Sequence, residues 1–313
     1  MSSNPKKVIV FMMNQLGDLL FALPILCGIK GKWLGVKVFV YAKKEHGELL
    51  RSSGYVDGIV DKQPIISSVI KIRQEGFDTG VFISESPFSA LTGFFSGIKN
   101  RLGFETASLS LLYTRTAQRP GVPSMTNNRE LGKLLGIDSM PQDYKGIIRL
   151  PDDVLKKADQ WIYEHKLDTH RMVIIAPGTS SRRKNKAWLM NNWEMLMKKI
   201  IDANLFPVLV GSPEETEMLN YMAGALNGEP KVFAPGSLVQ VAAMMKRSNL
   251  FVGTDSGAMH LAASFGTKVI ALFGPTDPAQ VGPQPLRENI ILKEDSVDKI
   301  SVDRVMDEIE KAI

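Results

Sequence analysis

The sequence predicts an α/β protein made of two halves, each with a parallel sheet between layers of helices. Short apolar runs alternate with amphipathic stretches along the chain, and the runs are rich in Val and Ile. Continuous apolar runs suit parallel strands that are covered on both faces. Strand–helix alternation of this kind is typical of a doubly wound fold. The pattern pauses once, at the proline-rich stretch 120–152, which indicates a boundary between two Rossmann-like domains.

Each half supplies its own series of strands and helices. In the first half, strands are expected at 8–13, 37–42, 58–60 and 79–83, with helices at 19–31, 44–53 and 65–75 and a helical piece at 128–136. In the second half, strands are expected at 171–176, 206–211, 231–234, 250–254 and 268–273, with helices at 152–166, 189–203, 213–227, 237–247 and 257–265. We therefore expect domains at 1–155 and 156–313 that face each other across a cleft. A final helix at 297–313 could fold back on the first domain.

The composition is that of an ordinary globular protein. The chain has 313 residues, 44% of them hydrophobic and 23% charged, and this length favours two domains. No stretch approaches the ~20 apolar residues that span a bilayer. The polar start and the short apolar run at 8–13 do not resemble a signal peptide, so we expect a cytoplasmic protein. A single cysteine, Cys27, excludes an internal disulfide and a cysteine-based zinc site.

The positive charge is concentrated in the first half. The net charge is +5, and residues 1–150 hold 19 Lys and Arg against 12 Asp and Glu, which leaves the rest at −2. An excess of +7 indicates an anionic partner such as a phosphorylated lipid, a membrane surface or a nucleic acid, or merely a solvated surface. Because no nucleic-acid-binding module is recognisable, we expect no nucleic-acid partner.

A carboxylate follows the first expected strand, in the segment 14–20. Ligand crevices of open α/β sheets lie at the carboxyl ends of the strands. There, Asp18 could take a proton from a substrate hydroxyl, and Gly17 would allow close backbone approach. The alternative is that Asp18 is a helix N-cap. Neither a G-x-G-x-x-G fingerprint nor a Walker sequence is present.

A loop rich in hydroxyls and cations, 176–188, follows the first strand of the second half. Hydroxyls, amides and a lysine at a strand end can together bind a diphosphate. The alternative is a solvated basic loop that Trp188 anchors at its far end. Charge alone does not decide between Lys184 and Lys186.

The most specific motif spans 252–263, where a strand ends and a helix begins near Ser256. Free amides and the helix dipole at such a start attract phosphate. His260 lies one turn further, three residues after Gly257, and can reach the same ligand as Asp255, or it is simply a buried helix residue.

A weaker motif at 211–215 brings a carboxylate just after a strand. Glu214 or Glu215 could accept bonds from ribose hydroxyls, or could compensate the dipole of a helix start.

Together these motifs resemble the heptosyltransferases of glycosyltransferase family nine, which build the inner core of lipopolysaccharide from ADP-heptose. The order and spacing of several motifs carry the resemblance: Gly17-Asp18 with Leu23-Pro24, the segment 101–104 (RLGF), Pro177-Gly178-Thr179 through Lys186 and Trp188, Gly211-x-Pro213-x-Glu215, 255–263, and 273–276 (FGPT) with Gly282-Pro283. Departures from the pattern include Leu20 and Phe21, Ser256, Leu189 and the segment 84–90.

The resemblance implies a GT-B fold, in which the first domain binds the acceptor and the second binds the donor. Asp18 matches the catalytic base. The implied donor contacts are Thr179, Ser180 and Lys186 to the phosphates, Glu215 to the ribose, Gly236 to the base, and Asp255, Ser256, Gly257 and His260 to the diphosphate. The Lys186-x-Trp188 pattern selects Lys186 over Lys184, and a longer loop would let Ser181 replace Ser180.

We therefore expect an inverting transferase that moves heptose from ADP-heptose to a lipid-linked inner-core acceptor, with peripheral contact at the inner face of the inner membrane. The donor loops contain no D-x-D element, so we expect no metal and no cofactor. The cations expected to meet acceptor phosphates are Arg51, Arg73, Lys99, Arg101 and Arg119. The alternatives are transfer of another activated sugar to an O-chain or protein, or a non-catalytic nucleotide- or glycan-binding relative.

Overall fold

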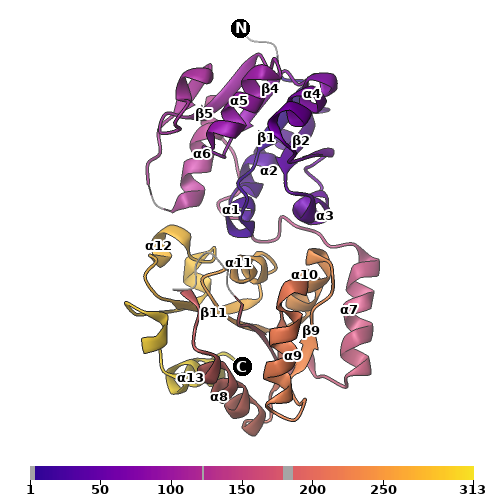
Figure 1. The fold of residues 1–313 in the computed structure, drawn as a ribbon, viewed down its shortest axis with the longest axis vertical. Coiled ribbons are helices and arrows are strands. Elements are labelled where there is room, and N and C mark those ends of the chain that lie inside the picture. The colour runs from indigo at the N-terminus through magenta and orange to yellow at the C-terminus, as the bar shows by residue number, and fades with distance from the viewer. Residues whose placement is uncertain (1–3, 122, 179–185) are drawn as a thin grey trace. The chain divides into compact units, whose positions relative to one another are not determined.

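The computed structural model describes residues 4–121, 123–178 and 186–313. It divides into two compact units, Met1–Arg149 and Leu150–Ile313 (Figure 1). The expected boundary at 155 falls inside helix α7 (Asp152–Glu164) and is therefore too late. This helix packs against α10 (Leu238–Arg247) of the second unit and buries Val154, Ala158 and Ile162.

The first unit holds a six-stranded parallel sheet in the order β3-β2-β1-β4-β5-β6. Its strands are β1 (Lys7–Phe11), β2 (Lys37–Ala42), β3 (Gly58–Asp61), β4 (Thr79–Phe82), β5 (Asn100–Phe104) and β6 (Arg115–Ala117). Its helices are α1 (Leu16–Leu20), α2 (Leu23–Lys32), α3 (Gly47–Arg51), α4 (Ile65–Glu75), α5 (Pro87–Phe95) and α6 (Ser124–Leu134), with 3-10 turns η1 (Lys44–His46) and η2 (Ser110–Leu112).

The second unit holds a parallel sheet in the order β12-β11-β10-β7-β8-β9. Its strands are β7 (Met172–Ala176), β8 (Phe206–Val210), β9 (Lys231–Phe233), β10 (Leu250–Thr254), β11 (Lys268–Phe273) and β12 (Ile290–Lys293). Besides α7 and α10, its helices are α8 (Met190–Asp202), α9 (Thr216–Gly224), α11 (Gly257–Ser264), α12 (Pro278–Val281) and α13 (Val302–Ala312). Among its 3-10 turns are η5 (Pro213–Glu215) and η7 (Val297–Lys299).

Both sheets have the same doubly wound order when each is counted from its own first strand. The order in which the chain adds strands to the sheet reverses between β1 and β4 in the first unit and between β7 and β10 in the second, and we call these two places the reversal points. Strands β7 and β10 are buried along their full length, as expected for strands covered on both faces. The predicted α/β class with two Rossmann-like domains is thus confirmed. Ligand sites are expected at the two reversal points.

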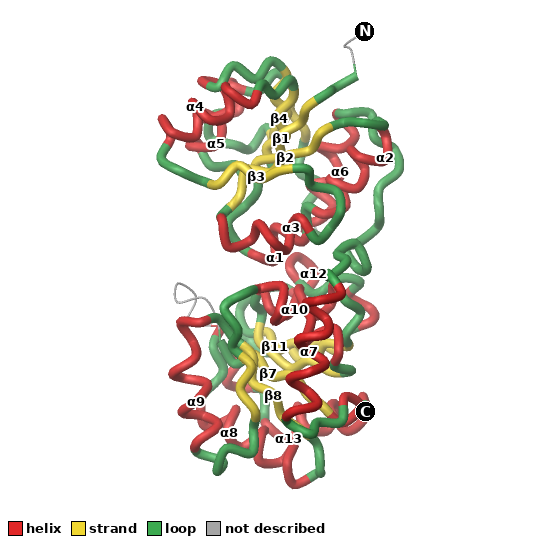
Figure 2. Tube along the Cα trace, turned by 90° about the vertical axis from the view of Figure 1, so that its right-hand side faces the viewer, coloured by secondary structure: helices red, strands yellow, loops and turns green. Residues whose placement is uncertain are grey.

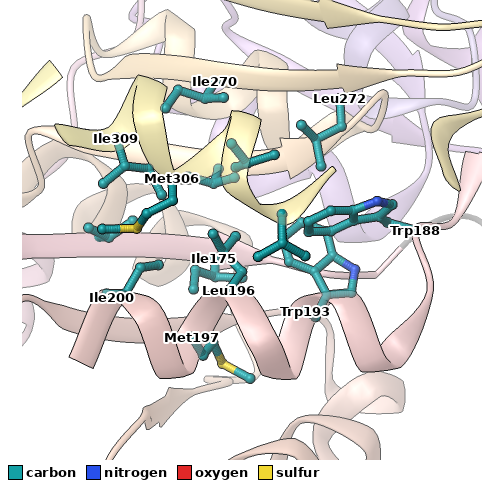
Figure 3. Packing of buried hydrophobic residues seen from close by; sticks show 14 of the residues in the cluster. Ile175, Trp188, Trp193, Leu196, Met197, Ile200, Ile270, Leu272, Met306 and Ile309 are labelled. Atoms are coloured by element: carbon teal, nitrogen blue, oxygen red, sulfur yellow. The ribbon is translucent and has the colours of Figure 1, made fainter. Parts of the chain in front are cut away.

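Helices cover both faces of each sheet (Figure 2). In the first unit α4 and α5 pack together on one face, and α2 and α6 pack together on the other. In the second unit, the core on one face combines α8, α9 and α13 around Trp188 and Trp193, whose rings meet edge to face at 4.9 Å (Figure 3). Helix α13 contributes its apolar residues Val305, Met306 and Ile309 to this core. That face is therefore part of the core of the second unit.

Among the helices and strands of the described residues, five were not expected: α5, α12, β5, β6 and β12. Strands β5 and β6 begin with exposed or half-buried polar residues, and β6 has only three residues, so their apolar signal is weak. Helix α5 has its phenylalanines on the outward side and buries the small residues Ser89, Ala90, Thr92 and Gly93, so it lacks the large apolar inward face by which helices are recognised. Among the described residues, no helix is both long and apolar enough to cross a membrane.

Candidate active site

The reversal point of the second sheet brings a lysine and an aspartate together. Asp255 directly follows β10, and its carboxylate forms an ion pair with the Lys186 ammonium. Lys186 is 4% exposed and Asp255 is 8% exposed. Thr276, beyond the end of β11, donates a hydrogen bond of 2.6 Å to the same oxygen, Oδ2, of Asp255. Lys186 and Asp255, which the sequence analysis gave as separate donor contacts, thus contact each other. Thr276, which it quoted only within the motif 273–276, belongs to the same cluster.

Burial makes this pair rigid and costly to break. Two charges lose hydration on burial, and their mutual attraction offsets this loss only while both partners are present. Trp188 fixes the chain two residues after Lys186, because its indole Nε1 donates to the carbonyl oxygen of Ile300 at 3.1 Å. The Lys186 ammonium therefore has a defined orientation beside the end of β10.

The start of α11 offers free donors next to this pair. Ser256 is the N-cap residue, but its hydroxyl makes no capping bond. Within the described parts of the chain, the buried hydroxyls of Thr254 and Ser256 have no hydrogen-bond partner. Buried polar groups normally find partners. An anion that accepts bonds from the Ser256 hydroxyl and from amides near Gly257 would supply them.

His260 lies one turn into α11 and is 4% exposed. Burial lowers the pKa of its imidazole to about 4; the Asp255 carboxylate opposes this shift and the Lys186 ammonium adds to it. The imidazole is therefore neutral near pH 7 and hydrogen-bonds the backbone of Val281. The single N–H of the neutral ring is donated to the Val281 backbone, so the other nitrogen can accept a hydrogen bond from a ligand but brings no charge.

Glu215 is fixed in the turn after β8. It forms a capping box with Ser212, whose backbone N–H donates to Glu215 Oε2 at 2.7 Å. Its carboxylate also packs against Gly178 just beyond β7, where an added Cβ would lie 1.7 Å from Oε1. A side chain at 178 would therefore displace the Glu215 carboxylate. Glu215 therefore caps a helix start and also lies at the ligand edge of the sheet, whereas Glu214 is exposed.

Gly236 is exposed in the loop between β9 and α10, and a Cβ added to it would meet no atom within 4 Å. Its backbone is thus open to a ligand. Thr179, Ser180, Ser181 and Lys184 lie outside the described residues.

In the first unit, Asp18 is half-buried in the first turn of α1, beyond the end of β1. The N-cap residue of α1 is Gln15, so the alternative that made Asp18 an N-cap is wrong. Lys62, directly after β3, donates 2.6 Å bonds to the carbonyl oxygen of Met12 and to Oδ1 of Asn14. Burial lowers the pKa of Lys62 to about 8, with a further contribution from the charge of Lys43.

Lys62 thus ties down the loop that leads from β1 to Asp18. The sequence analysis missed it, although a cation directly after a strand was a usable signal.

The cations expected to bind acceptor phosphates are not gathered at one place. Arg119, beyond the end of β6, pairs with Glu85, which follows β4, at the edge where the strands end. Arg51 is exposed at the end of α3.

Three of the five lie at the opposite edge of the sheet, where strands begin. Lys99 precedes β5 and Arg101 is its second residue, while Arg73 is in the last turn of α4. Arg101 donates to the carbonyl oxygens of Leu112 and Ile98, and Arg73 donates to that of Phe95. Because Asp18 follows the carboxyl end of β1, these three cations are not grouped with it.

The chain matches the model of "Glycosyltransferase family 9 (heptosyltransferase)" over residues 66–308. It is 26% identical over 231 residues to lipopolysaccharide heptosyltransferase 2 of Escherichia coli K12, covering 70% of this chain and 66% of that protein. It is 23% identical to lipopolysaccharide heptosyltransferase 1 of the same strain, covering 88% and 90%.

Solved structures show the same fold. The Veillonella parvula family 9 glycosyltransferase matches with a TM-score of 0.86 at 19% identity, covering 99% of each chain. The E. coli ADP-heptose heptosyltransferase II matches at 0.83 and 21%, covering 98% of each. An E. coli heptosyltransferase solved with ADP-2-deoxy-2-fluoro heptose matches at 0.76 and 21%, covering 98% of this chain and 100% of that one. These likenesses confirm the expected GT-B fold. The chain belongs to glycosyltransferase family 9, the heptosyltransferase family of glycosyltransferases.

Proposed function

We propose that the protein transfers heptose from ADP-heptose to a lipid-linked inner-core acceptor of lipopolysaccharide, at the cytoplasmic face of the membrane. The observation that carries the donor assignment is the buried Lys186–Asp255–Thr276 cluster beside the start of α11. An oriented ammonium and free helix amides suit a diphosphate. Relatives are named heptosyltransferases, and one is solved with an ADP-heptose analogue, which supports ADP-heptose as donor.

In this proposal the second unit stabilises the leaving group. Lys186 and the amides near Gly257 bind the diphosphate, whose negative charge grows as the bond to the anomeric carbon breaks. Donors fixed in advance at such a charge are often the largest part of catalysis. Asp255 is a carboxylate and would repel a diphosphate, so it acts through Lys186 as a positioning residue. Glu215 binds ribose and the Gly236 backbone binds the base. Thr179 and Ser180 would add phosphate contacts.

In the first unit, Asp18 is the catalytic base. It takes the proton of an acceptor hydroxyl as that oxygen attacks the anomeric carbon and the diphosphate departs with the bonding electrons. One displacement of this kind inverts the anomeric configuration. Asp18 follows β1 at the reversal point of the first sheet, where ligands of such sheets bind. Lys62 positions the loop through Met12 and Asn14.

The test measures two quantities on purified protein: ADP affinity by calorimetry, and heptose transfer to lipopolysaccharide truncated before the first heptose, by mass spectrometry. Asp18→Asn should lower transfer about 10²- to 10⁴-fold, the usual contribution of a general base, with ADP affinity unchanged. Asp138→Asn, an exposed aspartate of the same unit, is the matched control. The anomeric configuration of the product reports inversion.

Each part of the proposal can fail separately. Near-normal transfer by Asp18→Asn would remove the base assignment. Equal competition by ADP, UDP and GDP would remove the donor assignment. Donor binding without transfer or hydrolysis would favour the non-catalytic alternative.

A further inference from the structure

The outward side of α4 and α5 is unusually apolar for a helical layer facing solvent. Ile66 and Ile70 on α4 are 74% and 53% exposed, and Phe88, Phe94 and Phe95 on α5 are 67%, 42% and 53% exposed. These five residues form what we call the α4–α5 patch. Contiguous exposed apolar surface commonly marks a site for a protein partner or a membrane.

The patch is held as one surface. Arg73 near the end of α4 donates a 2.5 Å bond to the carbonyl oxygen of Phe95, and the Ser96 hydroxyl donates to that of Val69 at 3.4 Å. The two helices therefore lie side by side on one face of the first sheet (Figure 2).

The inward side of these helices already supplies the core, through Ile72 of α4 and Ala90 of α5. Packing of the sheet therefore does not require the exposed phenylalanines and isoleucines.

Four cations lie close to the patch along the chain, and the acids of the same stretch bind other partners. The stretch 65–101 contains Lys71, Arg73, Lys99 and Arg101, and its acids are Glu75, Asp78 and Glu85. Each acid is already engaged: Glu75 pairs with Lys7 at 2.6 Å, Asp78 accepts from the backbone of Lys6 and Lys7, and Glu85 pairs with Arg119. The Arg101 guanidinium lies over the Phe94 ring, 5.3 Å from its centroid, which joins the charged and apolar surfaces.

We propose that the α4–α5 patch docks the first unit on an anionic phospholipid surface. Phenylalanine and isoleucine side chains would enter the boundary between head groups and acyl chains, while Lys71 and Lys99 meet lipid phosphates. The cations favour a negative surface over a second copy of this chain, whose patch would carry the same positive charge. The inference rests on the proposed function only in that a lipid-linked acceptor would be reached at the same surface; the docking itself needs no transfer.

The experiment is co-sedimentation of the full chain with vesicles of phosphatidylcholine alone or mixed with phosphatidylglycerol. The protein should bind the mixed vesicles more tightly, and binding should weaken as salt rises. The double variant Phe88→Ser with Phe95→Ser should bind on the order of tenfold or more weakly, because both changes remove apolar insertion. Lys71→Gln with Lys99→Gln should lose about thirtyfold on mixed vesicles and little on phosphatidylcholine.

The matched control is Leu34→Ser with Tyr221→Ser, which removes two exposed apolar side chains that do not belong to the patch. It should bind vesicles like the parent chain. The Phe88→Ser with Phe95→Ser variant and the control should keep the parent's circular dichroism and its transfer to a soluble, deacylated acceptor, which separates docking from the proposed function.

Equal vesicle binding by the patch variant and the parent would overturn the proposal. So would a parent chain that ignores anionic vesicles but sediments as a dimer that Phe88→Ser with Phe95→Ser dissociates.

Discussion

The two units share one strand order but differ in how their reversal points handle charge. In the second unit, Lys186 and Asp255 are buried and neutralise each other within the site, and His260 beside them is neutral. In the first unit, Asp18 is half-buried and Lys62 is partly buried, with its bonds going to a carbonyl and an amide oxygen. Two sheets with the same strand order therefore differ in the burial and pairing of the charged residues at their reversal points.

The difference fits the two tasks that the proposed reaction assigns. A departing diphosphate is best stabilised by donors fixed in advance in a site that excludes water. A base that receives an acceptor hydroxyl has to remain accessible to it. A change in the site of the second unit should therefore alter the stability of the fold. A change in the site of the first unit should mainly alter the geometry of the loop that leads to Asp18.

The largest expected effect tests whether the second site is part of the folded core. Asp255→Ala should lower the free energy of unfolding by about 3–5 kcal/mol, because Lys186 is left as an unpaired buried charge. Urea unfolding followed by tryptophan fluorescence measures it, since Trp161, Trp188 and Trp193 all lie in the second unit.

The control is the exposed pair of Lys198 and Asp202 on α8, 3.1 Å apart, where Asp202→Ala should cost at most about 0.5 kcal/mol. The double variant Lys186→Met with Asp255→Ala should be more stable than Asp255→Ala alone, because no lone charge remains. Equal losses of unfolding free energy in Asp255→Ala and Asp202→Ala would show that the buried Lys186–Asp255 pair does not stabilise the folded core.

A smaller effect tests the first site, where we expect catalysis to change more than stability. Lys62→Met removes two bonds from a charged donor to the loop before Asp18, so kcat should fall about thirtyfold, equivalent to ~2 kcal/mol. ADP affinity should not change.

Lys37→Met is the matched control. Lys37 is 65% exposed at the start of β2, on the edge where strands begin. A loss of ADP affinity in Lys62→Met, or unchanged kcat, would contradict the role given to Lys62.

The sequence analysis predicted the central strands from their apolar runs and several candidate site residues from motifs at the ends of those strands. Continuous Val and Ile runs located the central strands β1, β7 and β10, and the residues just after them included Asp18 and Asp255. Order along the chain does not reveal which strands are neighbours. The sequence therefore could not show that Lys186, Asp255 and Thr276 converge from three different strand ends.

Two differences between the sequence analysis and the structure concern the surface of the first unit. Helix α5 was missed because its phenylalanines face outward and its buried side holds only small residues, which inverts the usual pattern of large apolar residues facing the core. Arg73, Lys99 and Arg101 were grouped with the acceptor site by charge alone, but they lie at the edge where strands begin. Patterns report burial within a globular core, and they mislead where large apolar side chains lie on the surface.

The smallest expected effect concerns the pH dependence of the second unit. The pKa of the His260 imidazole is about 4 in the folded protein, below its usual 6.5, so only the unfolded state binds a proton between these values. The resulting stability is present above pH 6.5 and is lost as pH falls towards 4. Between pH 6.5 and 5 the loss should be about 1.5 kcal/mol.

His260→Gln cannot take up this proton, so its free energy of unfolding should fall less over the same interval, while carboxylates titrate equally in both proteins. Urea unfolding of both proteins at pH 6.5 and pH 5 measures the difference. Parallel losses would mean that the ring is already charged in the folded state at pH 5, and then the second site would not keep its imidazole neutral. The contrast between the two units would then be confined to the Lys186–Asp255 pair.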